Sequence, residues 1–197
     1  MKVYEATKKR RSVRRFKDRP VPFEVLEKCV NAARLAPSGR NSQVCEYIAI
    51  NDAAILPGIF ENIGGSVKLP PEKGGPRPEQ TARAYIIILI NKNIEPDANQ
   101  RRMSYYDVGM AAENIMLVAL EQGLGSCPVM RYDESALKPI LNIPDNFDIA
   151  LVIVMGYPDE SPVAEVSTGA VDVKVDEKGV RHVYKRKLAD ILHKNGF

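Results

Sequence analysis

Two continuous apolar runs, Ala84–Ile90 and Ile149–Met155, constrain the fold of this chain more than any other feature of its sequence. Both runs are rich in β-branched residues and have no polar face, which is typical of strands that helices cover on both sides. Each run has about seven residues, far fewer than the roughly 18 that a membrane-spanning helix needs. We therefore expect two inner strands of one sheet and no transmembrane segment.

Helical spacing and turn residues predict the elements around these strands. Apolar residues recur at helical spacing in Pro22–Ala36, and Pro37 stops this helix. A second, mostly apolar helix is expected to begin at a capping box near Ser104 and to end at Gly123. The other expected elements are a strand at Tyr47–Ile50, a helix at Asp133–Leu141 capped by Asp133, and a hairpin within Val171–Tyr184. With a length of 197 residues, the chain is predicted to form a single α+β domain over 1–197, with one sheet under helices.

Two glycine-containing stretches have different predicted roles. Half of the 16 residues at 64–79 are Gly or Pro, which predicts a mobile loop or a lid. The glycines at 123–125 follow a predicted helix, whereas a Rossmann fold places its glycines between a strand and a helix N-terminus. At 123–125 we therefore favour a Schellman-type helix stop followed by a close approach of two backbones.

Cysteine and histidine are too few to build the common metal and hydrolase sites. Cys29, Cys45 and Cys127 lie far apart and form no CxxC pair, so no disulfide framework and no zinc site is expected. His182 and His193 are the only histidines, which excludes an HExxH motif and disfavours a Ser/His/Asp hydrolase. The charged N-terminal stretch MKVYEATKKRR lacks the apolar core of a signal peptide, so we expect a cytoplasmic protein.

Positive charge is concentrated in the first 19 residues, where nine Lys and Arg residues face only Glu5 and Asp18. Three explanations stay open: a solvated helix face or loose basic arm, a nucleic-acid-binding arm, and a site for the phosphate of a small ligand. A second basic cluster, Lys185-Arg186-Lys187, favours the third explanation, because both ends of the chain could converge on one anion.

Four motifs in a fixed order carry a family resemblance. They are Arg10-Arg11-Ser12-Val13-Arg14, Ala36-Pro37-Ser38-Gly39-Arg40-Asn41-Ser42-Gln43, Asp107-x-Gly109-x-Ala111-x-x-Asn114 followed by Gly123-Leu124-Gly125-Ser126, and Gly156-Tyr157-Pro158. In order and spacing this set resembles the FMN-dependent nitroreductase family over most of the chain. The resemblance implies a nitroreductase-like α+β fold with a central mixed, mainly antiparallel sheet flanked by helices. It also implies a homodimer that holds FMN at the subunit interface and binds neither nucleic acid nor a membrane.

The resemblance further implies which residues contact FMN. Arg10, Arg11 and Ser12 would hold the phosphate and ribityl chain, together with Lys185 or Arg186 from the other end of the chain. Arg14 would lie beside the pyrimidine edge, where a fixed cation stabilises the anion that builds up at N1–O2 on reduction. The remaining implied contacts are backbone N–H groups near N5 from the stretch Pro128, Val129 and Met130, and partner-subunit contacts from Pro37, Ser38, Gly39 and Asn41.

The implied reaction moves hydride from NADH or NADPH to flavin N5, and from there to an acceptor such as a nitroaromatic or a quinone. No catalytic side chain is expected, because the chemistry is centred on the flavin. The alternatives are reductive dehalogenation or flavin fragmentation on the same fold and, more remotely, a non-catalytic basic module that binds nucleic acid. The sequence leaves open the acceptor, the choice between NADH and NADPH, and which of Arg77, Gln80 and Arg83 contacts the flavin.

Overall fold

The structure, a computed structural model, describes residues 1–94, 98–169 and 171–197, and for 98–101 it describes the backbone alone. The chain forms two compact units, Met1–Asp159 and Glu160–Phe197. The expected single domain over 1–197 stays a prediction.

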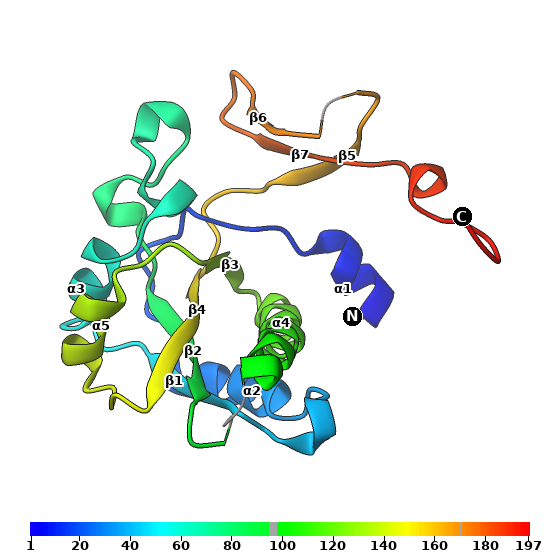
Figure 1. The fold of residues 1–197 in the computed structure, drawn as a ribbon. Helices are drawn as coiled ribbons and strands as arrows, with labels where there is room; N and C mark the ends of the chain where they lie inside the picture. The colour runs from blue at the N-terminus through cyan, green and yellow to red at the C-terminus, as the bar shows by residue number, and fades with distance from the viewer. Residues whose placement is uncertain (95–97, 170) are drawn as a thin grey trace. The chain divides into compact units, whose positions relative to one another are not determined.

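The first unit is built on a four-stranded sheet (Figure 1). Its strands in spatial order are β1 (Cys45–Ile50), β2 (Ala84–Asn91), β4 (Phe147–Gly156) and β3 (Gly125–Val129). Every neighbouring pair is antiparallel. The two apolar runs form the inner strands β2 and β4, because a strand covered on both faces needs apolar side chains in both directions. The predicted α+β fold is confirmed, and the mainly antiparallel sheet is fully antiparallel in this unit.

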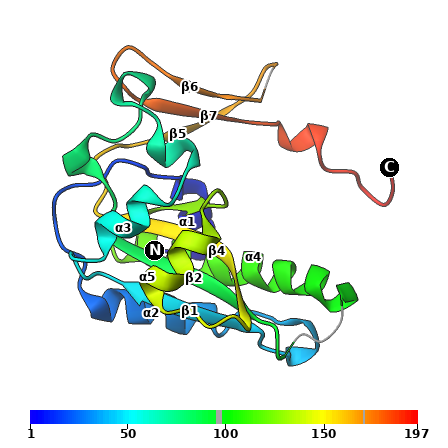
Figure 2. The ribbon, with the colours of Figure 1, turned by 60° about the vertical axis from the view of Figure 1, so that its left-hand side comes forward.

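Helices cover both faces of this sheet. One face carries α2 (Phe23–Ala33) and α4 (Ala98–Glu121), and the other carries α3 (Leu56–Glu61) and α5 (Glu134–Leu141) (Figure 1, Figure 2). Side chains of β2 alternate between the two cores: Ile86 and Ile88 pack with the first pair of helices, Ile87 and Leu89 with the second. Among the described residues, no helix combines the length and the hydropathy that crossing a bilayer requires.

Helix α4 begins earlier than the sequence pattern predicts. The expected capping box at Ser104 is wrong, because Ser104 lies inside α4 and its side chain is buried. Residues 98–103 contain no glycine or proline, so nothing local prevents the helix from starting before Ser104.

The ends of the helices agree better with the sequence. After α4, Gly123 has a φ of 78°. The N–H groups of Gly123 and Leu124 donate to carbonyls of the last helical turn, as in the predicted Schellman stop. Asp133 caps α5 as predicted, because its carboxylate accepts a hydrogen bond from the Ala136 N–H.

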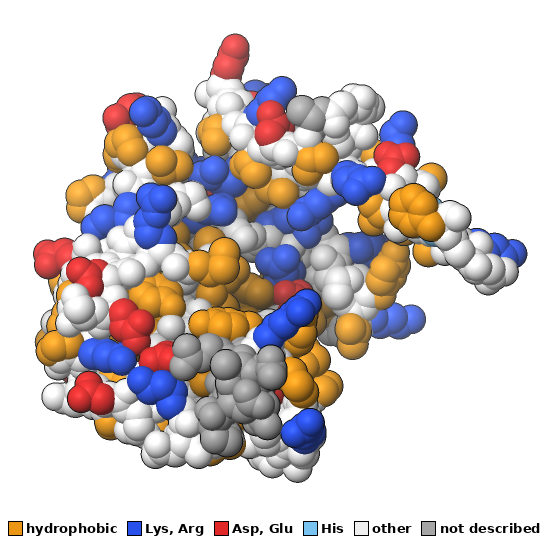
Figure 3. All heavy atoms as spheres, viewed as in Figure 1, with side chains coloured by type: hydrophobic (Ala, Val, Ile, Leu, Met, Phe, Trp, Pro, Cys, Tyr) orange, Lys and Arg blue, Asp and Glu red, His pale blue; other side chains and the backbone are white. Residues whose placement is uncertain are grey.

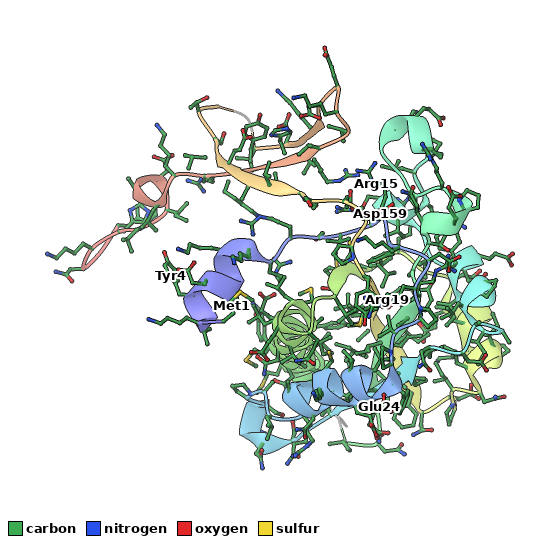
Figure 4. The ribbon with its side chains drawn as sticks, turned by 180° about the vertical axis from the view of Figure 1, so that it is seen from behind. Met1, Tyr4, Arg15, Arg19, Glu24 and Asp159 are labelled. Atoms are coloured by element: carbon green, nitrogen blue, oxygen red, sulfur yellow. The ribbon has the colours of Figure 1, made fainter. Side chains whose placement is uncertain are left out.

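The basic N-terminal segment is ordered along the sheet rather than loose. It begins with α1 (Val3–Lys9) and then runs extended, and the Val13 N–H donates to the Ser126 carbonyl at 2.9 Å. Further along, the Asp159 N–H donates to the Arg15 carbonyl at 2.9 Å, and these two residues lie side by side in Figure 4.

The second unit contains a small mixed sheet. Its strands in spatial order are β5 (Val163–Val166), β7 (Arg181–Lys185) and β6 (Val173–Val175). β5 is parallel to β7, and β6 is antiparallel to it, so β6 and β7 form the predicted hairpin.

His182 on β7 connects this strand to β5 and to the turn between β6 and β7. Its Nδ1 lies 2.5 Å from Glu165 Oε1 on β5, and its Nε2 lies 3.2 Å from Asp176 Oδ2 in the hairpin turn. The hydrogen bond to Glu165 is the first cause of a raised His182 pKa, and the bond to Asp176 is the second. The pKa of Asp176 is lowered, first by the Val180 N–H that donates to it and then by His182.

We expect the small sheet to be most stable where His182 is charged, because its ring lies between the carboxylates of Glu165 and Asp176. Because the folded-state pKa is raised, this stabilisation is complete below the unfolded value of about 6.5. It is lost as the pH rises through the folded value. An NMR titration should give His182 a higher midpoint in the native protein than in the Glu165→Gln variant. Equal midpoints in the two proteins would contradict this assignment.

Candidate functional site

A cavity of about 310 Å³ lies where β3 ends. One wall is the turn Gly64-Gly65-Ser66, and the other is the segment Pro128-Val129-Met130-Arg131. The three predicted backbone-contact residues, Pro128, Val129 and Met130, therefore line one cavity. Met130 is 83% exposed, so its side chain points into solvent and its backbone forms the wall.

Arg14 connects the basic segment to this cavity. Its Nε donates to Ser66 Oγ at 2.5 Å, and its Nη1 donates to the Ser12 carbonyl at 3.1 Å. These two bonds hold a permanent positive charge at the edge of the cavity.

Backbone contacts hold the two walls of the cavity together. The Gly64 N–H donates to the Arg131 carbonyl at 2.7 Å, and Ile63 pairs with Tyr132 in an isolated bridge. A Cβ on Gly64 would lie 2.6 Å from the Arg131 side chain, and Gly65 has a φ of 76°, a conformation that favours glycine. The first residues of the predicted Gly/Pro-rich loop therefore form one wall of the cavity. The loop itself contains three short 3-10 turns, at Gly65–Lys68, Pro71–Lys73 and Pro78–Gln80.

The glycines of the 123–125 stretch also position the basic segment. Ser12 and Ser126 form an isolated parallel bridge, so the segment lies against the start of β3. A Cβ on Gly125 would lie 2.7 Å from the Val13 side chain. Gly125 therefore permits the predicted close approach, and it does not open a dinucleotide-binding helix.

Arg10 and Arg11 make contacts within their own chain. Arg10 Nε lies 3.2 Å from Glu113 Oε1 on α4. Arg11 turns back toward α1 and donates to the carbonyls of Lys8 and Arg10. The pKa of Arg11 is lowered, first by burial and then by the neighbouring Arg10 cation. Contact of either side chain with a phosphate stays a prediction.

A second candidate surface is the loop at 37–43, which is organised by Asp107 on α4. Asp107 is only 5% exposed. Its Oδ2 accepts a hydrogen bond from Ser38 Oγ at 2.9 Å, and its Oδ1 accepts one from the Gly39 N–H at 3.0 Å. Ser38 Oγ also accepts a bond from the Gln43 N–H at 2.8 Å. One buried carboxylate therefore constrains both ends of the loop.

The backbone of this loop is strained. Arg40, Asn41 and Gln43 have positive φ values of 55°, 56° and 51°. Each such non-glycine residue costs about 1–3 kcal/mol and persists only where its surroundings enforce it. The contacts of Ser38 and Gly39 with Asp107 supply part of that constraint, and strain of this kind is concentrated at binding sites.

The loop at 37–43 and the cavity at Pro128–Arg131 are separate features of one chain. Pro37 and Ser38 line a different cavity of about 120 Å³, and Gly39 lines one of about 30 Å³. Neither of these cavities includes a residue of 128–131. In this chain the close neighbour of Gly39 is Met103, whose Cε lies 2.6 Å from the position of an added Cβ. Contact of Pro37, Ser38, Gly39 and Asn41 with a flavin in the partner subunit stays a prediction.

The predicted phosphate contacts at the other end of the chain lie in the second unit. Lys185 is the last residue of β7, and Arg186 Nη2 donates to the Asp190 carbonyl at 2.7 Å. Their convergence with Arg10 stays a prediction.

The side chains of Gln80 and Arg83, two of the three residues that the sequence left open, have protein partners. Gln80 Nε2 donates to Asp159 Oδ2 at 2.6 Å, and Gln80 Oε1 accepts from the Arg77 N–H at 3.1 Å. Arg83 Nη2 lies 3.1 Å from Asp18 Oδ1. The cavity at Pro128–Arg131 is lined by none of these residues.

Sequence patterns did not identify Ser66 and Asp107 as site residues. Ser66 has no local signal, because it is one serine in a Gly/Pro-rich stretch. Asp107 belongs to one of the motifs that carry the family resemblance. That motif does not indicate that the Asp107 carboxylate accepts hydrogen bonds from Ser38 and Gly39.

Cys29 and Cys127 pack in the interior of the first unit, and Cys45 is partly buried. Cys29 and Cys127 are 0% and 3% exposed, and burial raises the pKa of the Cys29 thiol to about 12. Within the described part of the chain, no group of three or more His, Cys, Asp and Glu side chains is placed to hold a metal ion.

Comparisons with known proteins agree with the sequence resemblance. The family model described as "Nitroreductase family" matches residues 7–157. A protein of Archaeoglobus fulgidus, whose name includes NAD(P)H nitroreductase, is 31% identical over 155 residues, which cover 77% of this chain and 82% of that protein. An iodotyrosine deiodinase of Thermotoga neapolitana is 27% identical over 172 residues, which cover 80% of this chain and 89% of that protein.

The solved structures extend the similarity to the fold. An FMN-dependent nitroreductase from Clostridium difficile R20291 matches with a TM-score of 0.68 and 27% identity, covering 99% of this chain and 100% of that chain. A nitroreductase family protein from Clostridium novyi NT matches with a TM-score of 0.69 and 25% identity, covering 82% of this chain and 87% of that chain.

Proposed function

Because this chain belongs to the nitroreductase family, we propose that it is an FMN-dependent oxidoreductase. In this proposal it takes hydride from NADH or NADPH and reduces an acceptor such as a nitroaromatic or a quinone. The observation that carries this proposal is Arg14, fixed beside the cavity at Pro128–Arg131. FMN, when bound, supplies the atom that accepts hydride and later donates it.

The residues proposed to hold FMN suit it by the chemistry of their donors. Arg10 and Arg14 are always charged and forked, which suits a phosphate and a carbonyl edge. Ser12 adds a neutral hydroxyl. Backbone N–H groups for N5 come from Val129 or Met130, since Pro128 has none. Arg11, Lys185 and Arg186 are further proposed phosphate contacts.

The role of the protein in this proposal is positioning and electrostatics. Arg14 holds positive charge at the cavity edge, where it would stabilise negative charge that develops on reduction. Gly65 adds no side chain to one wall, and no atom lies within 4 Å of where its Cβ would be, so that a flat ring can lie close to the backbone there. No side-chain acid or base is assigned, because the chemistry is centred on the flavin.

We further propose that FMN binds between two copies of this chain, with Pro37, Ser38, Gly39 and Asn41 contacting the flavin of the partner. An exposed stripe on α4 supports this arrangement: Met103, Tyr106 and Met110 follow one another at helical spacing and are 37%, 57% and 37% exposed. Figure 3 shows hydrophobic side chains at the surface around α4. An apolar stripe of this kind is typical of a helix that packs against another subunit.

Introducing a charge into this stripe is expected to weaken the dimer. Met110→Glu should shift the monomer–dimer equilibrium by about tenfold, or about 1.4 kcal/mol, because a carboxylate would lose water on association. Light scattering over a dilution series measures the shift. Ile140→Glu is the matched control, because Ile140 is 38% exposed on α5, on the opposite side of the sheet. Equal shifts of the monomer–dimer equilibrium in Met110→Glu and Ile140→Glu would contradict an interface at α4.

The visible spectrum tests the proposed cofactor directly. The purified protein should be yellow, or should take up about one FMN per chain when FMN is supplied. Under nitrogen, NADH or NADPH should remove the flavin absorbance, and a nitroaromatic or a quinone should restore it. A colourless protein that takes up no FMN would refute the proposal.

A second reaction at the same site is supported by the deiodinase relatives, of which the Thermotoga neapolitana protein is one. If the chain catalyses reductive dehalogenation, the reduced protein should release iodide from iodotyrosine faster than it reduces a nitroaromatic. Comparing the two rates on one reduced sample discriminates between the reactions. The nucleic-acid alternative is disfavoured, because the chain belongs to the nitroreductase family.

A further inference from the structure

A cavity of about 330 Å³ lies between α3 and the segment that leads into β2. It shares no residue with the cavity at Pro128–Arg131. Its volume is at the lower end of the range of about 300–1,000 Å³ that is typical of ligand pockets. Most of its lining is apolar, including Leu56, Pro57, Phe60, Pro78 and Ala82.

The hydroxyl of Tyr85 is the first sign that this cavity binds a polar group. Tyr85 lines the cavity from β2 and is 0% exposed. Its hydroxyl is buried and has no hydrogen-bond partner among the described residues. A buried hydroxyl without a partner is costly, and most such groups bind water or a ligand.

Arg83 provides a second unpaired donor in the same lining. Its Nη2 is held by the Glu79 carbonyl at 2.8 Å and by Asp18 Oδ1 at 3.1 Å. Its Nε is buried and, like the Tyr85 hydroxyl, has no partner in the described part of the chain. Arg83 lies just before β2 and Tyr85 is the second residue of β2, and both side chains line this cavity. Burial raises the pKa of Tyr85, and the Arg83 cation opposes this shift.

The chemistry of the lining restricts the ligand. An Arg Nε can only donate a hydrogen bond, and a Tyr hydroxyl can donate one, so together they suit one oxygen acceptor. The apolar side chains of Leu56, Pro57 and Phe60 suit a flat or aliphatic body. Glu61 also lines the cavity and is exposed, which disfavours a ligand with two negative charges, such as a phosphate dianion.

We propose that this cavity is a second small-molecule site, which binds a monocarboxylate with an apolar body about the size of one aromatic ring. The carboxylate accepts hydrogen bonds from the Tyr85 hydroxyl and from Arg83 Nε. The apolar body packs against α3. The proposal does not depend on the flavin chemistry, since none of its residues lies in the proposed flavin site.

Benzoate is a suitable probe, with benzylamine as a cation of similar shape. The titration uses protein saturated with FMN, so that benzoate does not occupy a vacant flavin site, and follows amide resonances by NMR. Benzoate should shift the resonances of residues 56–61 and 81–85, and benzylamine should not. Shifts confined to 64–66 and 128–131, or equal binding of the two probes, would overturn the proposal.

Two tyrosine variants separate a ligand contact from a structural role. Tyr85→Phe removes an unpaired hydroxyl, so it should leave thermal stability unchanged or higher and weaken benzoate binding by about tenfold. Tyr132→Phe is the matched control, because the Tyr132 hydroxyl donates to the Ile149 carbonyl at 2.6 Å. It should lower stability and leave benzoate affinity unchanged. Unchanged benzoate affinity in Tyr85→Phe would mean that the Tyr85 hydroxyl does not bind the carboxylate, and would overturn the proposal.

Discussion

Replacing Arg14 with alanine is expected to weaken FMN binding by about 10- to 100-fold. This range corresponds to the loss of a hydrogen bond to a charged group, about 1.5–3 kcal/mol. Arg14 is held in place by Ser66 Oγ and by the Ser12 carbonyl, so little ordering of its side chain remains to oppose binding. The reduction potential of the bound flavin should also fall, because a cation near N1–O2 favours the reduced anion. Fluorescence titration of FMN measures the affinity, and equilibration with a reference dye measures the potential.

Two control variants make the Arg14 result specific. Arg14→Lys keeps the positive charge but loses the forked guanidinium. Its FMN affinity and flavin reduction potential should lie between those of Arg14→Ala and the native protein. Arg19→Ala removes a neighbouring arginine that stacks on the Tyr157 ring at 3.8 Å, and it should leave both quantities unchanged. If Arg14→Ala retains native affinity and potential, Arg14 does not contact the flavin.

Replacing Asp107 with alanine is expected to lower the free energy of unfolding by about 2–3 kcal/mol. The change leaves the Gly39 N–H and the Ser38 hydroxyl without their buried acceptor, and each unsatisfied buried group costs about 1–3 kcal/mol. Urea denaturation measures the loss. Because the loop at 37–43 would no longer be held in its left-handed conformations, FMN binding should weaken in the same variant.

Asp107→Asn and Asp52→Ala are the matched comparisons. Asp107→Asn keeps one acceptor oxygen and most of the packing, so it should lose less than half as much stability as the alanine variant. Asp52 accepts a hydrogen bond from the Ala54 N–H on the surface, so its removal should cost less than about 1 kcal/mol. Equal losses for Asp107→Ala and Asp52→Ala would contradict the role of Asp107 in organising the loop.

Elements with a strong local pattern were predictable from the sequence. The inner strands β2 and β4 follow from uninterrupted β-branched residues, and the end of α4 follows from Gly123. β3 was not predicted, because Gly125 and Pro128 weaken its strand pattern. At the edge of a sheet a proline is tolerated, since no ladder hydrogen bond is needed from it.

The site was predictable only in part. The motifs placed Arg14 and the segment Pro128–Met130 in one expected site, and the structure brings both to one cavity through Ser66. Ser66 was not predicted, because the Gly/Pro-rich stretch has no periodicity that assigns a direction to its side chains. The roles of Lys185 and Arg186 stay predictions, since these residues belong to the second unit.

The sequence alone determined the inner strands, the helix stop at Gly123 and the cap at Asp133, because each depends on residues within a few positions. Only the tertiary structure decided that Arg14 meets Ser66 and that Ser38 meets Asp107, across separations of 52 and 69 residues. The order in which the strands pair determines which distant segments become neighbours, and a single serine or aspartate has no local pattern that records its partner.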